Sequence, residues 1–302
     1  MSDRLVLVQI SLAALQNVLF ATATGVVVCG VMGQHAGLLE QVKLLVWRGL
    51  LITLLTLTAL AYLWLEAAAM SGSPLHNAGT AVGAVLTRSH FGKAWSLEVA
   101  GALLAALSCL LKERGFAVYA AAVLLWIAGK TATSHAADSG DFSLRESAHA
   151  MHLLATALWA GSVLVSAVLL RGSLWSSGAA ARQRAKFCYT LSQLATAALV
   201  AALVTGVCGV LHVKAQSGSQ VLYGGWGRLL AVKLTFVILT ICLGGYNRIM
   251  MLPKLRKNAE QDGFASRAAQ RRFNWVLSVE AVVMLAVFVV SAVLGHTAPM
   301  VG

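Results

Sequence analysis

The sequence predicts an all-α protein: a polytopic integral membrane bundle of about eight transmembrane helices, with both termini periplasmic. Composition is the first reason, because 59% of the 302 residues are hydrophobic, only 11% are charged and the mean hydropathy is +0.78. A soluble core cannot bury so much apolar sequence, whereas a bundle surrounded by lipid can expose it. The other two reasons are the spacing of the apolar stretches and the distribution of Lys and Arg between them.

A membrane-spanning helix needs about 20 mostly apolar residues. Eight stretches come close to this length, at about 5–32, 45–70, 95–111, 115–134, 148–170, 187–212, 229–250 and 275–296. The first follows Arg4 as a signal peptide would, but its apolar run is too long, so we expect a retained helix. The longest connectors, about 71–94 and 251–274, have room for short helices but not for a second core. We therefore expect a single membrane domain over residues 1–302.

Lys and Arg accumulate in cytoplasmic loops, and this rule predicts the orientation. The connectors after the first, third, fifth and seventh stretches hold about 15 of the 23 basic residues: Lys43, Arg48, Lys112, Arg114, Arg171, Arg182, Arg184, Lys186, Arg248, Lys254, Arg256, Lys257, Arg267, Arg271 and Arg272. These connectors are predicted to be cytoplasmic, although Arg4 on the outer side runs against the trend. Basic loops beside anionic lipid also explain the net charge of +12, so no nucleic-acid partner is needed.

Histidines are divided unevenly by this topology. Only His35 lies on the inner side, and seven fall at outer helix ends or in outer loops: His76, His90, His135, His149, His152, His212 and His296. Neutral imidazole is a common ligand for copper, zinc and haem iron, so the pattern indicates a metal site that faces the periplasm. The alternative for any single histidine, above all His76 and His212, is a polar residue at the membrane interface that bonds to a loop carbonyl.

His149-x-x-His152 at the start of the fifth stretch is the most informative pair, because residues three apart share a helix face. His135 ends the fourth stretch, and the connector is long enough to bring it back beside the pair. We therefore predict that these three share a metal ion, with ordinary interfacial packing as the alternative. Either His90 or His296 could supply a further ligand.

Sulfur ligands are less informative. Met70 ends the second stretch on the outer side and is a possible soft ligand for Cu(I), although most methionines in membrane helices only fill space. The cysteines form no CxxC pattern and are expected to be packing residues: Cys29, Cys109, Cys188, Cys208 and Cys242. A transfer of Cu(I) at the inner side through Cys29, Met32 and His35 is the alternative.

Ionisable residues within membrane helices are costly and often mark function. Four lie in the outer halves of their helices, near the histidines: Glu66, Glu98, Lys130 and Lys233. Glu98 either accepts a hydrogen bond from a ligating imidazole, binds metal itself, or pairs with one of the two lysines. Nearer the cytoplasm, we expect Arg248 and Glu280 to form an ion pair that joins the last two helices, and an inner gate beside Asn247 is a second possible role.

Several of these segments resemble the copper resistance D family. The resemblance is strongest over about 187–299, in Tyr223-Gly224 before a helix that contains Lys233, then Asn247-Arg248, then Val279-Glu280. It extends upstream to about residue 64 through four further segments: His152-Leu153-Leu154-Ala155 with Trp159-Ala160-Gly161, Ser134-His135-Ala136, Met70-Ser71-Gly72-Ser73-Pro74-Leu75, and Phe91-Gly92-Lys93-Ala94-Trp95.

The resemblance implies an eight-helix inner-membrane protein of bacterial copper homeostasis. Such a protein moves copper, as Cu(I) or Cu(II), across the membrane, often beside a periplasmic copper carrier of the copper resistance C family. His135 and His152 match family positions. His149 stands where many relatives are expected to have a carboxylate, and Glu98 stands where a basic residue is more usual. The roles of these two residues therefore rest on this sequence alone.

Two alternatives remain open. A b-type membrane cytochrome would also use histidines on facing helices, with His135 or His152 and His212 or His296 as axial ligands of haem. A non-transporting assembly factor would present copper to a periplasmic enzyme.

No nucleotide loop, serine nucleophile motif or pair of catalytic carboxylates is found in the sequence, so we do not expect an enzyme.

The predicted orientation can be tested by cysteine labelling. A membrane-impermeant thiol reagent added from the periplasm should label a cysteine introduced near Asp138 and should not label one near Gln261. The opposite pattern would place the histidines in the cytoplasm.

Overall fold

The structure is a computed structural model, and it describes residues 3–36, 41–111, 115–134, 143–171, 181–258 and 264–298. His135, Asp138 and Gln261, which the sequence analysis singled out, lie outside these ranges. The described residues form helices joined by short connections, and no strand occurs among them. The all-α prediction is therefore confirmed for this part of the chain.

Ten α-helices are described: α1 (Asp3–His35), α2 (Gln41–Ser71), α3 (Gly79–Arg88), α4 (His90–Ser108), α5 (Gly115–Ala132), α6 (Leu144–Leu169), α7 (Ala181–Ser217), α8 (Gly225–Tyr246), α9 (Leu252–Asn258) and α10 (Phe264–Gly295). Three shorter elements complete them: the 3₁₀ helices η1 (Leu75–Asn77) and η3 (Ser219–Leu222), and the π-helical turn η4 (Asn247–Met251). The connector around 71–94 thus holds short helices, as its length allowed.

Seven of the described helices are long and apolar enough to cross a membrane: α1, α2, α5, α6, α7, α8 with its continuation through α9, and α10. The remaining predicted span corresponds to α4. It has 19 residues and begins at His90, earlier than predicted. Lys93, Ser96 and Glu98 lower its hydropathy, because polar and charged side chains interrupt its first half.

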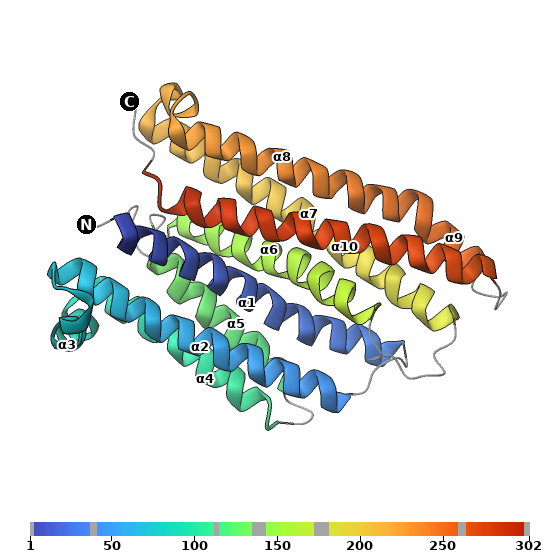
Figure 1. The fold of residues 1–302 in the computed structure, drawn as a ribbon, viewed down its shortest axis with the longest axis horizontal. Helices are drawn as coiled ribbons and strands as arrows, with labels where there is room; N and C mark the ends of the chain where they lie inside the picture. The colour runs from blue at the N-terminus through green and yellow to red at the C-terminus, as the bar shows by residue number, and fades with distance from the viewer. Residues whose placement is uncertain are drawn as a thin grey trace.

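The helices lie side by side as one elongated bundle (Figure 1). The centre is formed by α1, α6 and α10, which contact one another. On one side α2 packs on α1, α4 packs on α2 and α5, and α5 packs on α6. On the other side α7 packs on α6 and α8 packs on α10. Connections are short, so consecutive long helices run in opposite directions.

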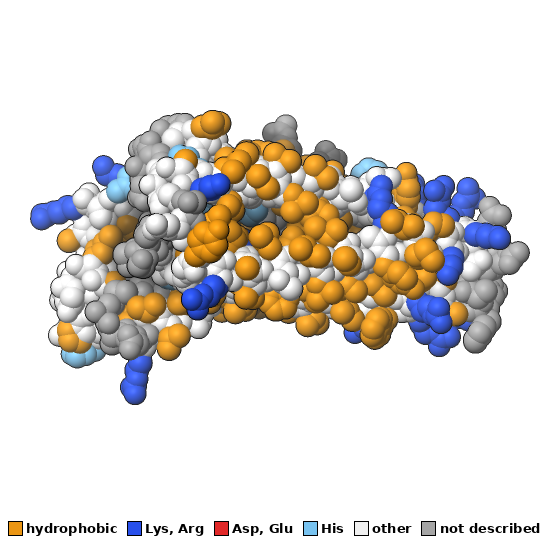
Figure 2. Space-filling view, turned by 90° about the horizontal axis from the view of Figure 1, so that it is seen from above, with side chains coloured by type: hydrophobic (Ala, Val, Ile, Leu, Met, Phe, Trp, Pro, Cys, Tyr) orange, Lys and Arg blue, Asp and Glu red, His pale blue; other side chains and the backbone are white. Residues whose placement is uncertain are grey.

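The two ends of the bundle differ in chemistry. One end of the bundle, which we call the histidine end, is where α1, α4, α6 and α8 begin and where α2, α5, α7 and α10 finish. Five described histidines lie at these helix ends: His90, His149, His152, His212 and His296. The other end, which we call the basic end, carries α9. Figure 2 shows Lys and Arg side chains gathered there and apolar side chains along the middle of the bundle. Exposed members of this group are Arg182, Lys186, Lys254, Arg256, Lys257, Arg267, Arg271 and Arg272.

The closest helix contact in the centre joins α1 to α6. A Cβ atom added to Gly25 would collide with the Gly161 carbonyl, and one added to Gly161 would collide with the Ala21 carbonyl. Small residues continue along this contact, where Cys29 Sγ lies 3.4 Å from Ser166 Oγ. In lipid, close backbone approach of this kind is a main source of helix association. The two glycines therefore set the distance between α1 and α6.

Gly25→Ala should destabilise the protein by about 1–3 kcal/mol, because the added methyl must push the two backbones apart. Gly209→Ala is the matched control, since nothing lies within 4 Å of its added Cβ atom. The control should be neutral or slightly stabilising, because Ala favours helix over Gly. Thermal unfolding in detergent compares the two, and equal midpoints would contradict this account of the contact.

Candidate metal centre

The histidine pair lies in the second and third turns of α6. Ser143 caps this helix by accepting a hydrogen bond from the Glu146 backbone N–H at 3.2 Å, which fixes where the helix starts. His149 and His152 then follow on one face, three residues apart. Both side chains are half-buried. The predicted pairing of the two residues on one helix face is thus present.

The ring of His152 is held against α7. Its Nδ1 lies 3.0 Å from the Ala202 carbonyl oxygen and 3.1 Å from Thr205 Oγ1. A carbonyl can only accept, so Nδ1 donates and Nε2 keeps its lone pair. Gly206 leaves space for the ring, because a Cβ atom there would lie 3.3 Å from His152 Cε1. A backbone carbonyl on the second ring nitrogen is the usual way in which a ligating histidine is oriented.

Positive charge lies close to the pair. Lys233 on α8 interacts electrostatically with both His149 and His152, and Arg145 interacts with His149. The pair therefore lies beside α7 and within electrostatic range of Lys233 on α8. In its protonated form Lys233 would repel a cation bound there, and the repulsion grows in proportion to the cation's charge.

The other described histidines are directed to other partners. His90 is exposed, and its Nε2 donates to the Ala132 carbonyl at 3.1 Å. His296 donates from Nδ1 to the Ala292 carbonyl at 2.8 Å, while its Nε2 lies 3.5 Å from the Tyr62 hydroxyl. His212 is half-buried, and its Nε2 has no hydrogen-bond partner within the described ranges. His76 in η1 is exposed.

The described residues therefore contain no group of three or more His, Cys, Asp or Glu side chains that could hold a metal ion. The structure brings together His149 and His152 only, and the predicted third ligand, His135, lies outside the described ranges. Met70, at the end of α2, has an exposed fraction of 52%, and no contact with the pair is found.

Glu98 belongs to a separate polar network on the α1, α2, α4 and α5 side. It is 3% exposed, accepts a hydrogen bond from Thr133 Oγ1 at 3.4 Å and interacts electrostatically with Lys130. Lys130 Nζ donates to Gln16 Oε1 at 2.8 Å and lies 5.1 Å from the centre of the Tyr62 ring. Glu98 therefore lies within electrostatic range of Lys130, one of its two predicted lysine partners, and its role in binding metal stays a prediction.

The same network continues to Glu66, which accepts from Gln9 Nε2 at 3.1 Å and interacts with His296. Sequence reasoning missed Gln9 and Gln16, which are 5% and 1% exposed. Their spacing of seven residues within an apolar helix was the available signal, because it places both on one face. Buried amides in a membrane helix need partners, and α2 supplies one to Gln9 Nε2 and α5 one to Gln16 Oε1, whereas Gln16 Nε2 has none within the described ranges.

Arg248 does not pair with Glu280, which corrects the sequence prediction. The guanidinium group instead donates to α7: to the Ser192 carbonyl and hydroxyl oxygens at 3.0 Å each, to Thr196 Oγ1 at 2.9 Å and to Gln193 Oε1 at 3.1 Å. These neutral oxygens satisfy the guanidinium donors, while the Glu280 carboxyl group of α10 lies beside Gly244 of α8.

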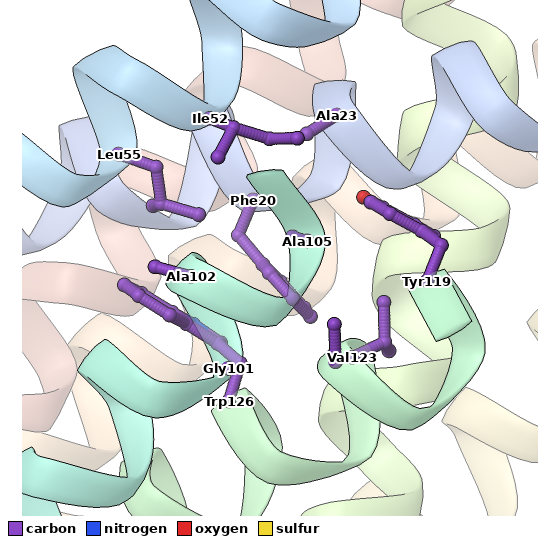
Figure 3. Close-up of a pocket in the computed structure, with 11 residues that line it drawn as sticks. Phe20, Ala23, Ile52, Leu55, Gly101, Ala102, Ala105, Tyr119, Val123 and Trp126 are labelled. Carbon is purple, nitrogen blue, oxygen red and sulfur yellow. The ribbon is translucent and has the colours of Figure 1, made fainter. Parts of the chain in front are cut away.

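A small cavity lies between α1, α2, α4 and α5 (Figure 3). Its volume is about 20 Å³, which suits about one water molecule. Phe20, Trp126 and aliphatic side chains line it, and the Tyr119 hydroxyl and the Trp126 indole N–H are the polar side-chain groups among its lining residues. The cavity therefore offers no set of metal ligands.

A helical bundle with seven helices fit to span a membrane, histidines at one end and basic residues at the other defines a polytopic membrane protein. Two family models match the chain: Copper resistance protein D-like, N-terminal domain, over residues 1–144, and Copper resistance protein D over residues 185–294. The chain belongs to the copper resistance protein D family and is a multi-pass inner-membrane protein. Membership connects it with copper-related function at the membrane.

One similar protein is "Inner membrane protein YebZ" of Escherichia coli (strain K12). It is 23% identical over 221 residues, which cover 70% of this chain and 70% of the relative. No solved structure matches the chain.

A double-mutant cycle tests the contacts of Arg248. Arg248→Gln and Thr196→Val should each destabilise the protein by about 1.5–3 kcal/mol, because each breaks a hydrogen bond to a charged group. The double variant should lose less than the sum, since both changes remove the same bond. Arg248→Gln combined with Glu280→Gln should be additive. Coupling between Arg248 and Glu280 in chemical denaturation would restore the original ion-pair prediction.

Proposed function

We propose that this chain binds copper at the His149 and His152 pair and moves it across the inner membrane. The observation that carries the proposal is the orientation of His152, whose Nδ1 donates to the Ala202 carbonyl at 3.0 Å and leaves Nε2 free to bind metal. Imidazole nitrogen suits copper, and the family is named for copper resistance.

In this proposal the histidine end faces the periplasm, so both termini lie on that side. The basic end, where exposed Lys and Arg gather in Figure 2, then lies in the cytoplasm, as the positive-inside rule requires. The helix α4 is the eighth span: its 19 residues would extend about 28 Å, close to the thickness of the hydrocarbon core. Glu98 faces the bundle, since it is 3% exposed, whereas Lys93 near the start of α4 is exposed.

His135 is the proposed third ligand, because its connector returns to the start of α6 and it matches a family position. Further contributions from His90, His212, His296 or Met70 would require these side chains to leave their present surroundings. His90 and His296 would each have to give up a hydrogen bond to a backbone carbonyl. We therefore limit the proposed site to His135, His149 and His152.

The position of Lys233 beside the two histidines affects which oxidation state of copper they would bind. Its interaction with both imidazoles makes a bound cation less stable, and the repulsion for Cu(I) is half that for Cu(II) at the same distance. Cu(I) also tolerates a small number of ligands that include neutral imidazole. We therefore propose Cu(I) as the transported ion, received from a periplasmic carrier of the copper resistance C family.

Substitution of the pair tests the site. His149→Ala, His152→Ala and the double change should each remove most bound copper from purified protein, because ligands of one ion are strongly non-additive. His76→Ala is the matched control: it removes an exposed histidine at the same end and should leave copper content unchanged. Copper analysis together with a visible spectrum decides between copper and haem. Small, independent losses would mean that the histidines do not share an ion.

Transport requires a second measurement, because an assembly factor that only presents copper would bind it equally well. Vesicles that contain the wild-type protein should accumulate copper from the histidine side, and vesicles with His152→Ala should not. Binding without accumulation would establish the non-transporting alternative.

A further inference from the structure

Glu280 is a buried carboxyl group in α10 that faces α8. Its exposed fraction is 4%, and a Cβ atom added to Gly244 would lie 3.0 Å from its Oε1. Because Gly244 has no side chain, the Glu280 carboxyl group has room beside α8. No part of the proposed copper site includes this residue.

No cation acts on Glu280 within the ranges that the structure describes. On α8, Lys233 precedes Gly244 by eleven residues, or about 16 Å along the helix. On η4, Arg248 is bound to α7. The basic residues of α9 and of the start of α10 are exposed at the basic end: Lys254, Arg256, Lys257, Arg267, Arg271 and Arg272.

The central helices that also pack on α10 bring no charge to it. The buried polar groups of α6 are Ser162 and Ser166, and the titratable group nearest to them on α1 is Cys29. Ser162 Oγ donates to the Trp159 carbonyl of its own helix at 3.0 Å, and Ser166 Oγ lies 3.4 Å from Cys29 Sγ. These groups therefore already have partners other than Glu280.

Asn247 lies three residues after Gly244, at the contact between α8 and α10 that Glu280 also faces. We call this contact the seam. Asn247 Nδ2 donates to the Phe273 carbonyl of α10 at 3.5 Å, whereas its Oδ1 is buried without a hydrogen-bond partner. Phe273 and Glu280 are seven residues apart on one face of α10. The backbone turns π-helical from Asn247, a feature that often accompanies functional sites. The seam thus combines a carboxyl group without a cation and an acceptor without a donor.

We propose that Glu280 is a proton-binding site whose proton is exchanged as copper crosses the membrane. The carboxylate takes up one proton and becomes neutral, which removes the cost of an isolated charge in low-dielectric surroundings and adds a hydrogen-bond donor to the seam. A metal ion fits less well, because hard cations need several oxygen ligands. Among the described side chains the seam offers the Glu280 carboxyl group, the Asn247 amide oxygen and the hydroxyl of Thr240, one turn before Gly244, which already donates to the Val237 carbonyl at 2.7 Å. The coupling rests on the proposed function, but the proton site itself does not.

Infrared spectroscopy of the purified full chain tests proton binding directly. The wild type at neutral pH should show the C=O band of a protonated carboxyl group, and Glu280→Gln should lack it. Glu98→Gln is the matched control, as it removes the other carboxyl group that is at most 4% exposed among the described residues, and the Glu280 band should persist in it. Identical spectra for the wild type and Glu280→Gln would overturn the proposal.

Glu280→Gln should fold, because the amide has the shape of the neutral carboxyl group. If it does not accumulate, Gly244→Ala answers the same question, since its methyl group would crowd Oε1 at 3.0 Å and should shift the band. A band unchanged in Gly244→Ala would then overturn the proposal.

Vesicle uptake under an imposed pH gradient tests the coupling. Copper uptake by the wild type should change with the direction of the gradient, whereas Glu280→Gln should bind copper normally and lose this dependence. An equal response in both would overturn the coupling. If the wild type moves no copper under any gradient, the proposed transport fails, and the infrared band still decides whether Glu280 holds a proton.

Discussion

The backbone contact between α1 and α6 at Gly25 and Gly161 is the constraint on which the other features depend. Because neither residue has a Cβ atom, the two helices touch through their backbones, and the register of α6 relative to α1 is set within a small tolerance. About three turns along α6 from Gly161 lie the two histidines, which thereby reach the level of Ala202 and Thr205 on α7. A histidine ring can meet a particular carbonyl only if the helix that carries it cannot slide or rotate.

Polar chemistry in this bundle is divided among three separate places. On α6, His152 contacts α7, and both histidines lie within electrostatic range of Lys233 on α8. Across the bundle, α1, α2, α4 and α5 enclose a network of amide, carboxyl and lysine groups whose members largely satisfy one another. Between α8 and α10, Glu280 and Asn247 face an apolar seam. Apolar side chains separate these places, so an ion that crosses the membrane would depend on helix movement to pass from one environment to another.

Close-packed α1 and α6 make the centre the rigid part of such a movement. The outer helices are better placed to move, and α8 in particular contacts mainly α10, with a π-helical turn where it joins α9. Arg248, just after α8, is bound to α7 by neutral oxygens rather than by a carboxylate. These hydrogen bonds satisfy the guanidinium donors with neutral acceptors, and they connect α7 to the turn that follows α8 without an ion pair.

The sequence by itself determined the helical class, most of the spans, the contrast between the two ends and the shared face of His149 and His152, because these follow from hydropathy, charge and a period of 3.6 residues within one helix. Only the tertiary structure decided which residues meet across helices. Arg248 donates hydrogen bonds to α7 instead of pairing with Glu280. Gln9 bonds to Glu66, and Gln16 bonds to Lys130. The physical reason is that contacts between helices depend on the rotation and register of each helix against its neighbours. Close backbone packing at residues such as Gly25 sets these quantities, and no periodicity within one segment records them.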